Sequence, residues 1–159
     1  MTDSKRTSPP KFPVSEPHRF LKGFLAHGGK PVAMPGALPE SLKATILEMD
    51  PEAGSAVVAF EPDERFLQGG GLIQGGIVTT MLDYVMAMAA FTRVGEGRSF
   101  STVSLTTHFL RPTLPGRHIA RAKLDRMGAR MIFASGEFLK EGATAPNATA
   151  TCVMAISGS

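Results

Sequence analysis

The hydrophobic pattern of this 159-residue chain is dominated by one stretch, residues 74–93, whose apolar residues fall on every side of a helix. They are Ile77, Val78, Met81, Leu82, Tyr84, Val85, Met86, Met88 and Phe91. A helix that is apolar all round must be buried on all sides. The stretch is shorter than a membrane span and carries Asp83 near its middle. The pattern therefore predicts a buried core helix wrapped by a sheet.

A narrow stripe of small and polar residues runs along this helix at spacings of three or four. Its members are Gly76, Thr79, Thr80, Asp83, Ala87 and Ala90. Asp83 stands too far from the helix start to be stabilised there by the helix dipole. Two interpretations stay open. Asp83 is either a core residue satisfied by hydrogen bonds or by Arg93, or a catalytic carboxylate whose pKa is set by its surroundings.

Shorter alternating segments predict six strands, which cover residues 41–49, 55–60, 100–111, 118–126, 130–139 and 148–156. Turn residues separate the last four at hairpin spacing, and residues 51–54 make the first two a hairpin. Alternation over 100–111 places Val103, Leu105 and Phe109 on one face and Thr102 and His108 on the other. The predicted class is α+β, with an antiparallel sheet curled around one long helix.

The N-terminal region differs from the rest in composition. Residues 1–17 are polar and broken by prolines, which predicts a disordered tail. Residues 16–27 then carry an apolar face suited to a short helix. We expect residues 18–159 to form a single domain, and the absence of an apolar leader predicts no secretory signal.

Composition and charge narrow the function classes. Hydrophobic content of 43% and charged content of 19% are ordinary for a globular protein. The net charge of +3 favours anions, but no basic helix or aromatic-interleaved patch indicates nucleic acid. The single cysteine, Cys152, excludes an internal disulfide and indicates a reducing cytoplasm. No set of His, Cys and carboxylate residues has metal-ligand spacing, so we expect no metal.

A glycine-rich run, LQGGGLIQGG, precedes the long helix. It lacks the Gly-Lys-Ser/Thr of a phosphate loop, and Gln74 stands where a dinucleotide fingerprint from Gly69 needs its last glycine. Gly75 and Gly76 instead open the helix with bare backbone N–H groups. Such groups form an anion or oxyanion site.

Taken together, these motifs resemble the PaaI-like branch of the hotdog-fold thioesterases. The family pattern is His-Gly-Gly, an Asp on the central helix, a strand ending in Phe-x-Arg-Pro, and a later Gly. The matching residues, within a resemblance spanning roughly 41–157, are Gly75, Gly76, Asp83, Phe109, Arg111, Pro112 and Gly116. The resemblance implies a hotdog fold and an acyl-CoA thioesterase. It also implies no cofactor beyond the coenzyme A carried by the substrate.

The resemblance also assigns roles. Asp83 would be the general base or nucleophile, and the N–H of Gly75 would polarise the thioester carbonyl. A hydroxyl of the strand after the helix, supplied by the partner subunit, would position water. Thr102 is the first choice for that hydroxyl and Ser101 the second.

Two glutamines depart from the family pattern. Gln74 replaces the usual His, and Gln68 stands where some members carry Asn. Glutamine keeps a donor and an acceptor but does not titrate. We therefore predict Gln74 to be a catalytic residue. Gln68 and Gly76 are predicted to bind substrate.

The remaining candidates concern substrate binding. Arg111, Arg126 and Arg130 lie near predicted strand ends, where CoA phosphates would meet them. Each of these arginines is also open to a simpler interpretation, as a solvated surface charge. His108 shares the predicted polar face with Thr102, but about 20 Å along the strand, too far to replace the missing His.

We expect a homodimer, or a dimer of dimers, because a six-stranded sheet covers only one side of an all-round apolar helix. An isolated subunit would expose an unusually large apolar patch. Two other functions stay open. A hotdog hydratase or dehydratase needs a His paired with the helix acid, which Gln74 removes. A non-catalytic acyl-CoA-binding protein would share the fold and differ only in turnover.

Overall fold

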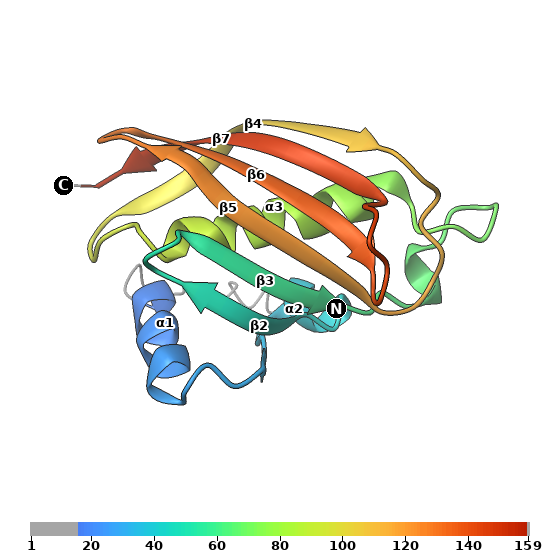
Figure 1. The fold of residues 1–159 in the computed structure, drawn as a ribbon, viewed down its shortest axis with the longest axis horizontal. Helices are drawn as coiled ribbons and strands as arrows, with labels where there is room; N and C mark the ends of the chain where they lie inside the picture. Colours follow the sequence, from blue (N-terminus) through green and yellow to red (C-terminus); the bar gives the residue numbers. More distant parts are fainter. Residues whose placement is uncertain (1–15, 159) are drawn as a thin grey trace, which may run out of the picture.

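The computed structural model describes residues 16–158. Figure 1 shows one antiparallel sheet curled around the long helix α3, Gly75–Phe91. Its seven strands lie in the order β1-β2-β3-β5-β6-β7-β4. The predicted α+β class, with a sheet wrapped around a central helix in the hotdog arrangement, is confirmed.

The strands are β1 (Val32–Ala33), β2 (Thr45–Asp50), β3 (Ser55–Phe60), β4 (Ser99–Phe109), β5 (His118–Met127), β6 (Met131–Lys140) and β7 (Ala148–Ser157). The helices besides α3 are α1 (Glu16–Ala26), α2 (Ala37–Ser41) and the 3-10 turn η1 (Glu64–Phe66). From β3 onward, the strands start and end within two residues of the predicted bounds. The predicted N-terminal helix is also present as α1. The predicted disordered tail lies outside the described residues, except for its last two, which begin α1.

The predicted strand at 41–49 starts too early. The N–H of Leu42 donates to the carbonyl of Leu38 and that of Ala44 to the carbonyl of Pro39, so the chain is still turning helically there. Lys43 adopts φ 50°, and the ladder to β3 begins only at Thr45. Local helical hydrogen bonds thus override the apolar alternation. The short β1, which no predicted strand covers, pairs with β2.

Small side chains let the sheet approach α3 closely. The inner faces of β5, β6 and β7 carry buried alanines, namely Ala120, Ala122, Ala134, Ala148 and Ala150. From α3, Met81, Leu82, Val85 and Met86 fill the interior and are fully buried. On α1, Leu21 and Phe24 bury against this core, and Lys22 forms an ion pair with Glu96. None of the helices within 16–158 is long and apolar enough to cross a membrane.

A β-bulge at Val103 changes which side chains of β4 face the helix. The pairing with β7 shifts between Thr102 and Ser104, and Val103 is 58% exposed. Thr102 and Thr107 consequently both reach α3. His108 lies on the opposite, outer side of the sheet. The predicted grouping of Thr102 with His108 is therefore wrong, because alternation in sequence does not reveal an inserted residue.

Candidate functional site

The side chain of Gln74 caps the start of α3. Its backbone is extended, with φ −62° and ψ 135°, and its Oε1 accepts a hydrogen bond from the N–H of Ile77 at 3.2 Å. A Cβ on Gly76 would lie 2.8 Å from that oxygen, so the second glycine makes room for the cap. Gln74 thus satisfies one of the helix-start donors that have no partner within the helix.

Gly75 is the first helical residue, and its N–H faces away from the helix body. The ring of Phe109 lies against its backbone, because a Cβ on Gly75 would meet the ring at 3.2 Å. A cavity of about 360 Å³ opens at this point. Gln68, Gly75, Phe109 and Arg111 line it, together with apolar side chains such as Val78. Three predicted site residues, Gln68, Gly75 and Arg111, are therefore brought together.

Asp83 meets a hydroxyl on the neighbouring strand. Thr102 Oγ1 donates to Asp83 Oδ1 at 2.9 Å. Arg93, the alternative partner, donates to the backbone carbonyl of Glu52 instead. The carboxylate is partly exposed rather than enclosed. It is held in place by a hydroxyl and keeps access to the surface.

This contact lies within a single chain, because Thr102 and Asp83 both belong to it. The water-positioning hydroxyl that the resemblance places on the partner subunit stays a prediction. Strand β4 runs along α3 of its own subunit, and the bulge turns Thr102 inward. Ser101, the second choice, pairs with Ala155 on the outer face and is exposed.

A second hydroxyl contact joins the same two elements and was not anticipated from sequence. Thr79 Oγ1 donates to Thr107 Oγ1 at 3.2 Å, one helical turn before Asp83. Both residues are partly buried. The small and polar stripe on α3 includes Thr79. Alternation along β4 does not predict that Thr107 faces α3, because it does not reveal the bulge. The two contacts together hold β4 along the exposed side of α3.

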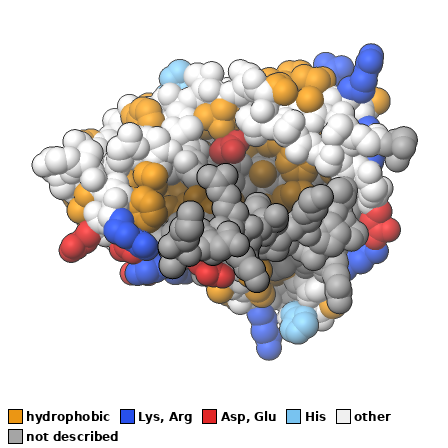
Figure 2. Space-filling view, turned by 180° about the vertical axis from the view of Figure 1, so that it is seen from behind, with side chains coloured by type: hydrophobic (Ala, Val, Ile, Leu, Met, Phe, Trp, Pro, Cys, Tyr) orange, Lys and Arg blue, Asp and Glu red, His pale blue; other side chains and the backbone are white. Residues whose placement is uncertain are grey.

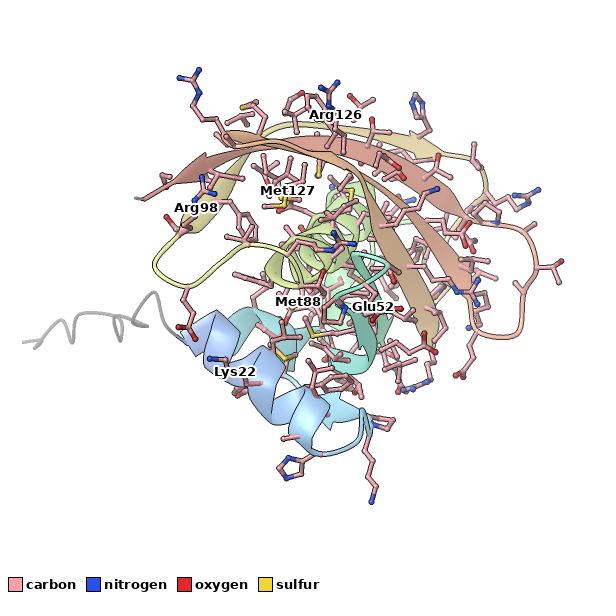
Figure 3. All side chains as sticks on the ribbon, turned by 60° about the vertical axis from the view of Figure 1, so that its left-hand side comes forward. Lys22, Glu52, Met88, Arg98, Arg126 and Met127 are labelled. Atoms are coloured by element: carbon pink, nitrogen blue, oxygen red, sulfur yellow. The ribbon has the colours of Figure 1, made fainter. Side chains whose placement is uncertain are left out.

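The other two arginines lie at the opposite end of the sheet. Arg111 donates to the carbonyl of Pro146, just before β7 begins. The carbonyl of Arg130 accepts from the N–H of Ile156, near the end of β7. These ends are roughly 30 Å apart at the usual strand rise. Figure 3 shows Arg126 on the outer side of the sheet, away from α3, so one chain does not gather the three arginines.

Two other groups near α3 are poor candidates for chemistry. Burial raises the pKa of the Cys152 thiol to about 11, and the charge of Asp83 acts in the same direction. That thiol is therefore protonated and a weak nucleophile at neutral pH. Burial likewise raises the pKa of Tyr84. Within residues 16–158, no three His, Cys, Asp or Glu side chains gather in a metal-binding arrangement.

The unpaired edge of the sheet is long and carries exposed apolar residues. Strand β4 pairs only with β7 and leaves its other edge open within the described residues. Val103, Phe109 and Leu110 on or after it are more than half exposed. Figure 2 shows hydrophobic side chains gathered around a hollow on the face opposite that of Figure 1. Exposed edges of this kind are pairing sites for another chain.

Known proteins resemble this chain in sequence and in fold. A model of the thioesterase superfamily matches residues 70–146. A protein of Saccharolobus solfataricus, which its name presents as a candidate esterase, is 33% identical over 87 residues. That alignment covers 55% of this chain and 61% of the length of that relative.

Solved structures agree with the family match. A phenylacetic acid degradation-related protein of Ralstonia eutropha is 34% identical, with a TM-score of 0.73. The match covers 84% of this chain and 97% of that one. A variant of the phenylacetic acid degradation protein PaaI of Thermus thermophilus is 28% identical, with a TM-score of 0.65. There the match covers 73% of this chain and 95% of the other.

Proposed function

The chain belongs to the thioesterase superfamily and is PaaI-like, and on this basis we propose that it hydrolyses the thioester bond of an acyl-CoA. Membership supports a thioester hydrolase in general. The observation that carries the finer proposal is the contact between Asp83 and Thr102, a positioned carboxylate on the open side of α3. We propose that the protein works in the cytoplasm, where its single buried thiol stays reduced.

Asp83 is the proposed general base. It takes a proton from water, the water oxygen bonds to the thioester carbonyl carbon, and the carbon–sulfur bond then breaks. The proton passes to the departing sulfur, so the products are a carboxylic acid and free coenzyme A. Direct attack by Asp83, followed by hydrolysis of the resulting anhydride, gives the same products. Thr102 orients the carboxylate in both cases.

The N–H of Gly75 is the proposed oxyanion donor. The carbonyl oxygen gains negative charge during attack, and a fixed N–H at a helix start stabilises that charge. Gln74 contributes by capping Ile77 and so fixing the first turn, rather than by moving a proton. Its carboxamide does not titrate.

Asp83 and Gly75 of the same chain are too far apart to act on one thioester. They lie on α3 at a separation of about 12 Å along the axis, given the rise per helical residue. The N–H of Gly75 also points away from Asp83. A carbonyl group and one attacking water span roughly 7 Å at ordinary contact distances. A complete site therefore needs Gly75 of one subunit and Asp83 of another.

Pairing of two β4 edges meets this need. Two copies joined by antiparallel β4 strands continue one sheet, and their α3 helices then run antiparallel on the same side. Asp83 of each chain is thereby brought toward the helix start of the other. The stripe of Gly76, Thr79 and Ala87 permits a close approach. We propose a homodimer on this ground, and association of two such dimers.

The cavity beside Gly75 is the proposed entry for the substrate. Gln68 offers hydrogen bonds there, and Arg111 brings positive charge near the CoA phosphates. The proposed reaction needs no metal and no cofactor besides the coenzyme A of the substrate. Two relatives are named for phenylacetic acid degradation, which makes phenylacetyl-CoA a natural first probe.

The test is release of free thiol from a panel of acyl-CoAs, from acetyl to palmitoyl, with benzoyl and phenylacetyl. The wild type is expected to hydrolyse at least one of these acyl-CoAs. The Asp83→Asn variant is expected to leave the same acyl-CoA unhydrolysed. Absence of turnover across the panel would overturn the proposal. Binding without turnover, measured by calorimetry, would instead favour a non-catalytic acyl-CoA-binding protein. The observation that favours this alternative is that Gln74, which stands in place of the usual His, caps the helix.

A further inference from the structure

One wall of the cavity beside Gly75 is a short segment that follows β4. Leu110, Arg111, Pro112 and Thr113 line the cavity and are hereafter the 110–113 segment. Leu110 is 52% exposed and Arg111 is also exposed, whereas Thr113 at the end of the segment is buried. Burial therefore does not hold the first part of the segment, and hydrogen bonds to its neighbours help to position it.

Most of these hydrogen bonds come from one place, the end of the β6–β7 loop. The carbonyl of Asn147 accepts from the N–H groups of Leu110 at 2.8 Å and Arg111 at 3.0 Å. Its side-chain Nδ2 donates to the carbonyl of Pro112 at 2.9 Å. Arg111 itself donates to the carbonyl of Pro146 at 2.6 Å. The 110–113 segment is thus tied to two consecutive loop residues.

Asn147 is in turn fixed to the sheet. Its N–H donates to the carbonyl of Phe138 at 2.7 Å, and its Oδ1 accepts from the N–H of Lys140 at 3.1 Å. The side chain therefore uses both ends of its carboxamide, one toward β6 and one toward the 110–113 segment. Asparagine meets this demand, whereas aspartate offers two acceptors and no donor.

The 110–113 segment connects this anchor to the helix start. The carbonyl of Thr113 accepts from the N–H of Ile73 at 2.8 Å, just before Gly75 in the chain. On the other side, Phe109 directly precedes the segment, and its ring rests on Gly75. The segment thus borders Gly75 both through the chain that leads into α3 and through the aromatic ring that covers it.

We propose that Asn147 is a positioning residue for the oxyanion donor. By fixing the 110–113 segment, it sets the placement of Gly75 and of the Phe109 ring beside it. It touches no reacting atom itself. The inference rests on the proposed function for its catalytic consequence, while its structural part is independent of the reaction.

The test compares Asn147→Asp and Asn147→Ala with a matched control, Glu141→Gln. Glu141 forms an ion pair with Arg117 at the other end of the same loop, away from the 110–113 segment. Asn147→Asp keeps the acceptor for Lys140 and replaces the donor to Pro112 by a second acceptor. Asn147→Ala loses both side-chain bonds, and either variant serves if the other folds poorly.

The first measurement is hydrogen–deuterium exchange of the native proteins by mass spectrometry. Both Asn147 variants are expected to exchange faster than wild type in the peptides covering residues 68–77 and 110–113, and the Glu141→Gln control to match wild type. Faster exchange confined to the β6–β7 loop, or no change, would overturn the proposal. This result does not depend on whether the protein hydrolyses acyl-CoA.

The second measurement is steady-state kinetics on the best substrate of the panel. A misplaced oxyanion donor weakens an interaction made mainly in the transition state, so kcat should fall with KM little changed. We expect a fall of roughly tenfold to a hundredfold, the scale of an ångström-sized misplacement. A wild-type kcat in folded Asn147→Asp would show that Asn147 is only structural. An inactive wild type would instead count against the proposed function.

Discussion

The hydroxyl of Thr102 lies 2.9 Å from the carboxylate of Asp83, across the gap between the edge strand β4 and the core helix α3. The contact depends on a bulge at Val103 that turns Thr102 inward. It gives the single carboxylate of α3 a defined orientation, and several consequences can be measured.

Replacing Asp83 by Asn separates the catalytic interpretation from the structural one. The amide keeps an oxygen that accepts from Thr102, so we expect a melting temperature equal to or above that of the wild type. Loss of a general base should lower kcat by roughly a hundredfold or more. Both quantities are measured on the same preparation. A wild-type kcat in a destabilised Asp83→Asn protein would mean that Asp83 is structural.

Gly75→Pro removes the proposed oxyanion N–H, and its ring also adds a Cβ against Phe109. Proline suits the first helical position, and the extended Gln74 is compatible with a following proline. Loss of one oxyanion donor is expected to lower kcat by about a hundredfold to a thousandfold. Gly75→Ala is the matched control, because it adds a Cβ against Phe109 but keeps the N–H. Equal activity of the two variants would show that the N–H has no role.

The two-subunit site can be tested by complementation. Asp83→Asn and Gly75→Pro each damage a different half, so either homodimer should be nearly inactive. After mixing under conditions that exchange subunits, each heterodimer carries one intact site, and activity should approach about a quarter of the wild-type value for random exchange. Light scattering checks that the species is a dimer. A monomer at micromolar concentration, or no recovery from a verified heterodimer, would contradict the shared site.

Arg111 should affect substrate affinity more than turnover. Arg111 lines the cavity beside Gly75, where we propose that it attracts the phosphates of coenzyme A. We expect Arg111→Ala to raise KM much more than it lowers kcat, and KM to rise with added salt in the wild type. Arg121→Gln, on the outer face and paired with Glu137, is the control. A KM independent of both salt and Arg111 would place the phosphates elsewhere.

His118 should make stability depend on pH. The ring is fully buried and stacks on Phe138. Burial lowers its pKa, the carbonyl of Gly116 partly opposes this, and Lys140 adds to the lowering. With the folded pKa below the unfolded value, the unfolded chain binds more protons on the acid side. Stability is therefore lost as the pH falls below about 6.5, by at most about 1.4 kcal/mol per pH unit.

Urea unfolding at a pH of about 7.5, 6.5 and 5.5, on both sides of the ordinary histidine pKa, measures this dependence. His118→Asn keeps a donor for Gly116 and removes the titration, so its stability should change less over this range. His108→Asn, which replaces a histidine on the exposed outer face, is the control. Identical pH profiles for wild type and His118→Asn would show that other groups are responsible.

The sequence alone was enough to identify the central helix, the succession of strands along the chain and the chemical candidates on α3. Its signals are local. An all-round apolar stretch of this length must be buried, and a single Asp in a small-residue stripe stands out wherever the helix packs. Gly75 and Asp83 are placed relative to each other by helix geometry, so their separation also follows from the sequence. The resemblance to the PaaI-like thioesterases rests on the same spacings.

Only the tertiary structure decided which side chains meet. The bulge at Val103 arises from pairing with β7, and periodicity within β4 does not reveal it. The contact of Thr102 with Asp83 and the anchoring of the 110–113 segment by Asn147 join residues distant in sequence. The side chain of Gln74 caps α3 by accepting from the N–H of Ile77, a contact that the sequence motif does not reveal. In each case, the packing of one element against another determines which side chains are in contact. No local sequence pattern predicts these contacts.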